Sequence, residues 1–310
     1  MGEAPRLPGR KIHRCGAAPD MDSVPAVAEV ARRASVPIVA DVHFDYRIAT
    51  RALEQGVDAV RINPGNIGGL EKLRAVVETA KAHDAAIRIG VNSGSVEKGL
   101  LEKYGLCAKS LCESALGHVK LLEDCGFEDI CISVKASDVA MTVEANRLLS
   151  TLCDYPLHIG VTEAGTKERG ILKSAAGIGA LLLDGIGDTI RISLTDAPEE
   201  EAHAGGELLR ALGLRSGVQF VSCPSCGRTE YDLIGTAKAV ETRLRDKPWN
   251  ITVAVMGCVV NGPGEASHAD YGIAGGKSEG VIFKHGEPVA RVASDRLADA
   301  LVELIERENQ

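Results

Sequence analysis

The chain has 310 residues, a formal net charge of −8 at pH 7, and a composition that is 45% hydrophobic and 25% charged. These proportions are those of an ordinary globular protein, long enough for one large domain and a small one. The negative charge and the 3% aromatic content argue against nucleic-acid binding, and no apolar run is long enough to span a membrane. Nine cysteines without an even disulfide framework favour a reducing compartment, and no apolar leader segment is recognisable, so we expect a cytoplasmic protein.

Apolar, β-branched runs alternate with helical patterns from residue 11 to residue 212. Strands without polar alternation are buried on both faces, which is typical of a parallel sheet covered by helices. The repeated order of strand and helix predicts an α/β fold, and its natural closed form is a TIM-type barrel, here over residues 11–216. The expected strands are 11–15, 36–42, 57–62, 86–91, 129–134, 157–161 and 189–194, and the expected helices are 26–34, 46–55, 69–83, 109–125, 139–152, 167–183 and 198–212.

Polar side chains occur at or just after the carboxyl ends of six successive expected strands. In a barrel these ends meet on the face that carries the catalytic βα loops. Four of the same strands carry a cation, and cations that converge in a protein of negative net charge indicate a phosphorylated small substrate. We expect one of the four to be paired with a neighbouring acid instead. The polar residues are His43, Asn63, Asn92, Lys135, Thr162 with Glu163, and Ser193, and the cations are Arg61, Arg88, Lys135 and Arg191.

The pattern changes after residue 216, and residues 217–310 are expected to form a small α+β domain. Its order is strand 218–222, helix 233–245, strand 251–256, a glycine-rich hairpin and a last helix. Cys223 and Cys258 each follow a strand of this domain. The two cysteine loops therefore lie together if the two strands are neighbours.

Three cysteines of the second domain have the spacing of metal ligands. Cys223 and Cys226 form a Cys-x-x-Cys pair, and Cys258 lies 32 residues beyond Cys226. An Asn-Gly-Pro-Gly turn between Cys258 and Glu265 could bring the Glu265 carboxylate to the same centre. Spacing alone leaves three hypotheses open: a cluster with one unusual ligand, a zinc site with an open position, and a zinc knuckle that only staples the domain. The other cysteines lack paired spacing and are expected to be small buried hydrophobic residues.

Several segments together resemble one enzyme family, the 4-hydroxy-3-methylbut-2-enyl diphosphate synthases, which are iron–sulfur enzymes of the non-mevalonate isoprenoid pathway. The resemblance covers the chain from about residue 36 to the C-terminus, and its motifs are highly specific. In the second domain it rests on Cys223-Pro-Ser-Cys-Gly-Arg228 and Met256-Gly-Cys-Val-Val-Asn-Gly-Pro-Gly-Glu265. Upstream it rests on Val39-Ala-Asp-Val-His-Phe-Asp-Tyr46, Arg61-Ile-Asn-Pro-Gly-Asn66, Arg88-Ile-Gly-Val-Asn92, Ser133-Val-Lys135, Gly160-Val-Thr-Glu-Ala-Gly165 and Asp188-Thr-Ile-Arg-Ile-Ser-Leu-Thr195.

The resemblance implies a [4Fe–4S] cluster held by Cys223, Cys226, Cys258 and Glu265. It implies the substrate 2-C-methyl-D-erythritol 2,4-cyclodiphosphate, which is reductively opened and dehydroxylated with ferredoxin or flavodoxin as electron donor. It also implies a homodimer in which the barrel of one subunit faces the cluster domain of the other. Glu163 is the implied acid–base group, and Glu265 is implied in catalysis as well as in metal binding. The implied substrate-binding residues are His43, Arg61, Asn63, Arg88, Asn92, Lys135, Thr162, Arg191, Ser193 and Asn261.

The N-terminal region departs from the family pattern. The family opens with a strand that ends in a Gln-Ser-Met-Thr-Asn stretch and with the helix that follows it, and neither is found here. A closed barrel of this type has eight strands, so we expect seven strands and an N-terminally shortened chain with little or no activity. Two other hypotheses stay open. One is a zinc-stapled barrel that binds a phosphorylated metabolite without redox chemistry, and the other is an inactive remnant of the synthase.

Overall fold

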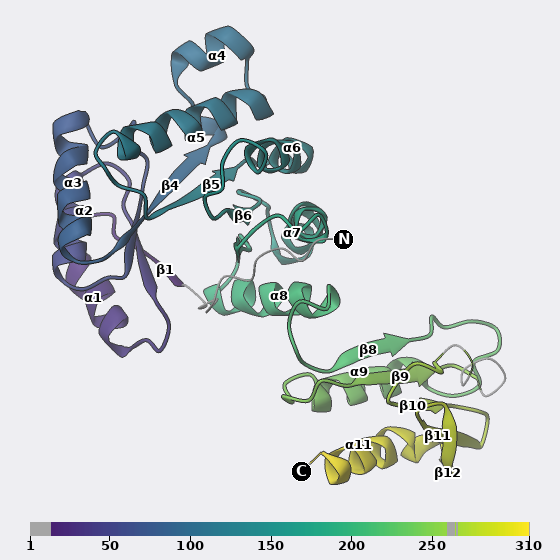
Figure 1. The fold of residues 1–310 in the computed structure, drawn as a ribbon. Helices are drawn as coiled ribbons and strands as arrows, with labels where there is room; N and C mark the ends of the chain where they lie inside the picture. The colour runs from purple at the N-terminus through teal and green to yellow at the C-terminus, as the bar shows by residue number, and fades with distance from the viewer. Residues whose placement is uncertain (1–13, 259–263, 265, 310) are drawn as a thin grey trace. The chain divides into compact units, whose positions relative to one another are not determined.

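The computed structural model describes residues 14–258, 264 and 266–309, and it separates into two compact units, of which the first ends at Gly205 and the second begins at Gly206 (Figure 1). Each unit has its own strand pairings, and the helix α8, Pro198–Ala211, crosses the boundary between the two in the sequence. Among the described residues, no helix combines the length and the apolar character that a membrane span needs.

The first unit is built on parallel strands that alternate with helices. Strands β1 to β5 form one sheet in chain order, β6 and β7 form a second, and a bridge between Ile132 and Leu157 connects β5 with the start of β6. These seven strands confirm the predicted α/β architecture. Over residues 14–205, no ladder joins β7 back to β1. The strands are β1 Arg14–Ala17, β2 Ile38–Asp41, β3 Ala59–Ile62, β4 Ala86–Asn92, β5 Ile130–Lys135, β6 His158–Gly160 and β7 Thr189–Arg191.

The helices of this unit follow the predicted ranges to within a few residues, with two additions. The 3-10 turn Ser93–Ser95 and the helix α4 between β4 and α5 were not predicted. No side chain of α4 is buried, so this helix lacks the apolar stripe by which a helix is recognised in a sequence. The helices are α1 Val24–Arg33, α2 Tyr46–Glu54, α3 Leu70–Ala82, α4 Lys98–Tyr104, α5 Ala108–Glu123, α6 Val139–Leu149, α7 Lys167–Leu183 and α8 Pro198–Ala211.

Strand β4 shows how the barrel wall places charged groups in its interior. Ile87, Ile89 and Val91 are fully buried and alternate with Arg88, Gly90 and Asn92. Because successive side chains of a strand point to opposite faces, the apolar series packs under the helices and the other series faces inward. Strand β1 begins at Arg14, three residues later than predicted, and residues 11–13 of the expected strand lie outside the described part of the chain.

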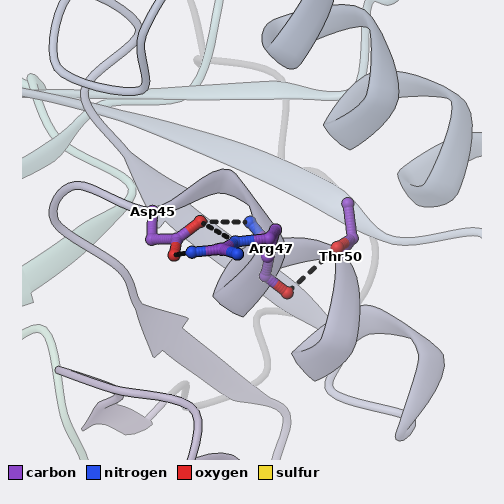
Figure 2. A network of polar contacts seen from close by, with 3 residues as sticks. All are labelled: Asp45, Arg47 and Thr50. Carbon is purple, nitrogen blue, oxygen red and sulfur yellow. Dashed lines mark hydrogen bonds and ion pairs between the residues drawn. The ribbon is translucent and has the colours of Figure 1, made fainter.

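The loop after β2 is held by the start of α2. Asp45 caps this helix by accepting the backbone N–H of Arg47 at 2.9 Å, and its carboxylate also accepts from the Arg47 guanidinium (Figure 2). The Arg47 side chain lowers the pKa of Asp45, which favours the charged capping form. Thr50 donates its hydroxyl to the carbonyl of Arg47 at 3.0 Å. These contacts hold Asp45, which directly follows His43 and Phe44, at the start of α2. They therefore restrict the conformation of the loop between β2 and α2.

The second unit has a mixed sheet in the order β12-β11-β10-β9-β8. Strands β8, β9 and β10 run parallel, whereas β11 and β12 are antiparallel additions that form the predicted hairpin. This arrangement confirms the expected small domain with a mixed sheet. The elements are β8 Gln219–Ser222, α9 Leu233–Leu244, β9 Thr252–Met256, β10 Tyr271–Ala274, β11 Glu279–Lys284, β12 Glu287–Ala293, a 3-10 turn Ser294–Arg296 and α11 Leu297–Glu308.

Helices α9 and α11 cover one face of this sheet. Val240 and Leu244 of α9 and Leu301 and Ile305 of α11 are fully buried in one cluster with Val253 and Ile273 of the sheet. A smaller cluster with Met256 and Phe283 lies apart from it. The second unit therefore has its own core, as a domain requires.

Candidate functional site

The four predicted cations lie around one small cavity inside the barrel wall. Arg61, Arg88, Lys135 and Arg191 come from β3, β4, β5 and β7, and all four line a cavity of about 30 Å³. Arg88 and Lys135 are each only 6% exposed, and the Nε atom of Arg88 is buried without a hydrogen-bond partner. A buried guanidinium N–H without an acceptor is costly, and an anionic ligand would satisfy it. The other lining residues are Asp41, Asn92, Ser133 and His158.

One of the four cations is already paired. Arg61 donates to Asp41 at 3.0 Å, as expected for one member of the set, and both side chains are 15% exposed. The Arg61 side chain occupies the space beside Gly90, where an added Cβ would lie 2.0 Å from Nε of Arg61. Glycine at this inward position of β4 is therefore what allows the guanidinium to lie across the barrel interior.

Two larger cavities adjoin the cationic one. A cavity of about 390 Å³ shares Asp41, Arg88, His158 and Arg191 with it and extends to Ala17 of β1 and to the first turn of α8. A second, of about 380 Å³, is lined by Glu163, Arg191, Ser193 and Glu201 among others. Arg191 borders all three cavities. The structure therefore places the four predicted cations, Asn92 and Ser193 along three cavities that share lining residues.

Glu163 follows β6 in an unusual backbone conformation. It is exposed and has φ of 52°, a left-handed value that a non-glycine residue adopts only when its surroundings impose it. Across the same cavity, Glu201 of α8 accepts the backbone N–H of Leu194 at 2.8 Å, directly after Ser193. The loops after β6 and β7 thus present an acid and a hydroxyl to one space, and α8 holds the second loop in position.

Three predicted site residues are not among the lining residues of these cavities. His43 is exposed with its ring centroid 6.0 Å from that of Phe44, and Thr162 is half-buried with its N–H bonded to Ala136. Asn63 is 4% exposed, and its side-chain oxygen accepts the N–H of Gly65 at 3.0 Å. That oxygen is therefore occupied in a local turn.

A buried histidine joins two of the loops at the carboxyl ends of the strands. His118 of α5 lies 2.9 Å from Glu97, in the loop after the 3-10 turn, and its ring also borders Gly65 in the loop after β3. Its Nδ1 atom is buried without a partner. Burial lowers the pKa of His118, although Glu97 opposes that shift. His118 thus acts as a neutral clip between the β3 and β4 loops.

Sequence reasoning missed three lining residues: Asp41, Ser133 and His158. His158 bonds Thr189 of the neighbouring strand through Nδ1 at 2.8 Å. The signal for Ser133 was present, because it stands two residues before Lys135 and so shares its inward face. The signal for Asp41 needs the register of β2 against β3, which places Asp41 opposite Arg61.

The cysteine loops of the second unit adjoin as predicted. Strands β8 and β9 are parallel neighbours with Ser222 opposite Val255, so Cys223 and Cys258 follow the carboxyl ends of two adjacent strands. The N–H of Cys223 is bonded to the carbonyl of Val255 at 3.0 Å. A Cβ added to Gly257 would lie 3.9 Å from Cβ of Cys223. The two loops are therefore in contact one residue before Cys258.

The residues of these loops fit a thiolate-bound metal centre. None of Cys223, Cys226 and Cys258 is joined in a disulfide, and the N–H of Arg228 together with the side chains of Arg228 and Thr229 lowers the pKa of the exposed Cys226 thiol. A stabilised thiolate is the form that binds iron or zinc. Within the described residues, no three His, Cys, Asp or Glu side chains stand close enough together to hold a metal ion. Two residues implied at this site, Asn261 and Glu265, lie outside the described part of the chain.

The remaining cysteines are less buried than expected. Cys112 is buried, whereas Cys107, Cys125, Cys131 and Cys153 are half-buried. The expectation of small buried residues is therefore right for Cys112 and too strong for the other four. The burial of Cys15 is not described.

By its fold and site, the chain is an α/β-barrel protein in which four cations line an interior cavity and a second unit carries the cysteine loops. Residues 6–206 match the family model of the GcpE TIM-barrel domain, and residues 219–307 match that of the GcpE protein C-terminal domain. The chain belongs to the GcpE family.

Curated relatives share one name, 4-hydroxy-3-methylbut-2-en-1-yl diphosphate synthase (flavodoxin). The relative from Clostridium acetobutylicum is 55% identical over 97% of this chain and 86% of its own length. That from Clostridium perfringens is 55% identical over 96% and 86%, and that from Geobacter sulfurreducens is 54% identical over 96% and 85%. The similarity therefore extends over both units of the chain and confirms the resemblance seen in its motifs.

Proposed function

We propose that the chain is an oxidoreductase that converts 2-C-methyl-D-erythritol 2,4-cyclodiphosphate reductively to 4-hydroxy-3-methylbut-2-en-1-yl diphosphate in isoprenoid biosynthesis. Relatives of 54–55% identity are named for the synthesis of this product. The observation that carries the proposal is the convergence of Arg61, Arg88, Lys135 and Arg191 on one cavity in a protein of net charge −8. A diphosphate is the chemical group that such a set of cations binds best.

In this proposal the barrel domain, residues 11–216, holds the substrate by its phosphates. The buried Arg88, whose Nε has no acceptor, gains one when the diphosphate enters. Glu163 moves a proton to the oxygen of the departing hydroxyl, since it shares a cavity with Ser193 and Arg191, whereas Glu201, the other acid of that cavity, is bonded to the N–H of Leu194. The substrate-binding set is His43, Arg61, Asn63, Arg88, Asn92, Lys135, Thr162, Arg191, Ser193 and Asn261.

The second domain, residues 217–310, holds a [4Fe–4S] cluster through Cys223, Cys226, Cys258 and Glu265. When bound, the cluster supplies single electrons and a Lewis-acidic iron. The cysteines anchor it by three thiolates from two adjoining loops, and the Glu265 carboxylate, a harder ligand than a thiolate, is the one most easily displaced. Glu265 therefore has a catalytic as well as a metal-binding role.

Flavodoxin is the proposed electron donor, in keeping with the names of the relatives, and ferredoxin is the alternative. We also propose a cytoplasmic homodimer in which the barrel of one subunit works with the cluster domain of its partner. The described residues that line the three barrel cavities are acids, cations, hydroxyls, amides, a histidine and aliphatic residues, none of which is redox-active. The electrons for the reaction would therefore come from the cluster domain.

A further cavity in the second unit is less suited to the substrate. It measures about 730 Å³ and lies between the first turns of α9 and α11. Its charged lining residues are Asp232, Asp295 and Asp299 against the single cation Lys277. This acidic excess repels a diphosphate, which favours the barrel interior as the substrate site.

The test is product formation by the anaerobically purified chain. We expect the cyclic diphosphate, incubated with reduced flavodoxin, to yield 4-hydroxy-3-methylbut-2-en-1-yl diphosphate detectable by mass spectrometry. The matched variants Cys258→Ser and Cys112→Ser separate the proposed ligand from a buried cysteine elsewhere, and only Cys258→Ser should abolish the product. A protein that carries a full cluster, binds the substrate and forms no product would overturn the proposal.

A further inference from the structure

A tight turn carries Cys226. The backbone N–H of Thr229 donates to the carbonyl of Cys226 at 3.0 Å, which closes a four-residue turn. In the opposite direction, the N–H of Cys226 donates to the hydroxyl oxygen of Thr229 at 3.3 Å. These two bonds hold the Thr229 hydroxyl beside the cysteine, and its oxygen lies 3.9 Å from the sulfur of Cys226.

The same hydroxyl touches the other cysteine loop. A Cβ built on Gly257 would lie 2.9 Å from Oγ1 of Thr229, closer than real Cβ contacts allow, and 3.9 Å from Cβ of Cys223. Gly257 directly precedes Cys258. The Thr229 side chain, which is half-buried, therefore lies where the loops of Cys226 and Cys258 meet.

The proton of this hydroxyl has one evident acceptor in the turn. The Cys226 N–H occupies a lone pair of the oxygen, and a hydroxyl keeps one proton to donate. A protonated thiol can act as either partner at 3.9 Å, but a thiolate bound to a metal has no proton and can only accept. Metal binding at Cys226 thus fixes the direction of the bond from Thr229 to sulfur.

We propose that Thr229 is a positioning residue that donates a hydrogen bond to the Cys226 sulfur and raises the reduction potential of the centre bound there. This inference rests on the proposed cluster. Hydrogen bonds to the sulfurs of an iron–sulfur cluster stabilise its more negatively charged, reduced state. The hydroxyl thereby makes the centre easier to reduce by an external donor, without contact with substrate.

The experiment compares Thr229→Val, which keeps the shape and removes the hydroxyl, with Thr229→Ser, which keeps the hydroxyl. Thr242→Val, on the exposed side of α9, is the matched control for the loss of a hydroxyl elsewhere in the same unit. Each full-length protein is loaded anaerobically, its iron and sulfide are counted, and its midpoint potential is measured by dithionite titration with electron paramagnetic resonance. We expect a more negative midpoint for Thr229→Val alone, with unchanged iron and sulfide.

Each other outcome also decides the question. An unchanged midpoint in a fully loaded Thr229→Val protein overturns the role of Thr229 and leaves the proposed function intact. If Thr229→Val loses the cluster and Thr229→Ser keeps it, with equal thermal melting of the two metal-free proteins, the hydroxyl acts by retaining the centre rather than by tuning its potential, which overturns the proposed effect on the potential. If both variants lose the cluster, packing rather than the hydroxyl is responsible and the inference falls. A wild-type protein that assembles no cluster overturns the inference together with the proposed cofactor.

Discussion

Asp41 and Arg61 stand opposite each other in the parallel register of β2 and β3 and form an ion pair of 3.0 Å inside the barrel wall. Both side chains are 15% exposed, so the pair is shielded from solvent more than a surface ion pair. It places the one described acid among the lining residues of the cationic cavity next to the guanidinium that a diphosphate would seek. In the proposed function, the diphosphate would therefore compete with Asp41 for Arg61.

Asp41→Asn should tighten anion binding. The substitution removes a negative charge beside the cavity and leaves Arg61 available, which at separations of a few ångströms is worth about tenfold in the Kd of pyrophosphate. Isothermal titration with pyrophosphate measures the effect. Asp184→Asn, which removes a surface partner of Arg147, is the control and should change nothing. Weaker binding by Asp41→Asn would show that Asp41 orients Arg61 rather than competing for it.

Arg191→Leu should weaken pyrophosphate binding. Arg191 borders all three cavities of the barrel, and a charge-assisted hydrogen bond contributes about 1.5–3 kcal/mol, or roughly 10- to 100-fold in Kd. Arg61→Leu should show a smaller loss of affinity, because the cation that it removes is already partly neutralised by Asp41. Arg147→Leu serves as the surface control. Wild-type affinity in both Arg191→Leu and Arg61→Leu would move the anion site elsewhere.

Glu201→Ala should lower turnover through the Ser193 loop. The variant leaves the partly buried N–H of Leu194 without its acceptor. The loss of this hydrogen bond costs about 1–3 kcal/mol and loosens the loop after β7. We expect about a tenfold loss of kcat/KM, whereas Glu201→Gln, which keeps an oxygen acceptor, should retain most of it. Steady-state kinetics on both variants measures this, with thermal melting to confirm folding. An equal loss in Glu201→Gln would point to the charge of Glu201 instead of its hydrogen bond.

His118 makes stability depend on pH in one direction. Burial holds its pKa below the ordinary value of 6.5, so the folded state binds fewer protons than the unfolded state as pH falls through that value. The contribution of His118 to the free energy of unfolding is therefore fully present at neutral pH and decreases on acidification below about pH 6.5. His118→Gln, which can still donate to Glu97 but cannot titrate, should lose less stability between about pH 7.5 and 5.5 in urea denaturation.

Glu97→Gln tests the opposing contribution to the same titration. Glu97 raises the pKa of His118 against the effect of burial, so its neutral replacement should lower that pKa further and steepen the loss of stability on acidification. Identical pH dependence of stability in the wild type and both variants would show that His118 does not cause it.

The elements that could be predicted from the sequence are those that its periodicity specifies. The buried strands ending in Lys135 and Asn92 and the strands preceding Cys223 and Cys258 were predicted because their apolar runs are unambiguous. The cations on four strands were predicted to converge because the carboxyl halves of parallel strands meet on one face. Those inferences needed no knowledge of register.

Other features depend on information that a single sequence does not hold. The pairing of Asp41 with Arg61 depends on the register of β2 against β3, and a slip of one residue would turn one of the two side chains to the other face of the sheet. Asn63, a predicted substrate-binding residue, accepts the N–H of Gly65 through its side-chain oxygen, a local contact with the backbone that asparagine often makes and that its strand position does not indicate. The contact of Thr229 with Gly257 joins segments from two different loops, so no local pattern indicates it.

The most direct test of the central claim is the iron and acid-labile sulfide content of the anaerobically purified chain. We expect brown protein with about four iron and about four sulfide per chain, bleached reversibly by dithionite. The same preparation of a Cys226→Ser variant should lose both elements, whereas Cys125→Ser should keep them. A colourless wild-type protein that holds one equivalent of zinc and no sulfide would contradict the proposed iron–sulfur cluster, because zinc has no electrons to deliver to the substrate.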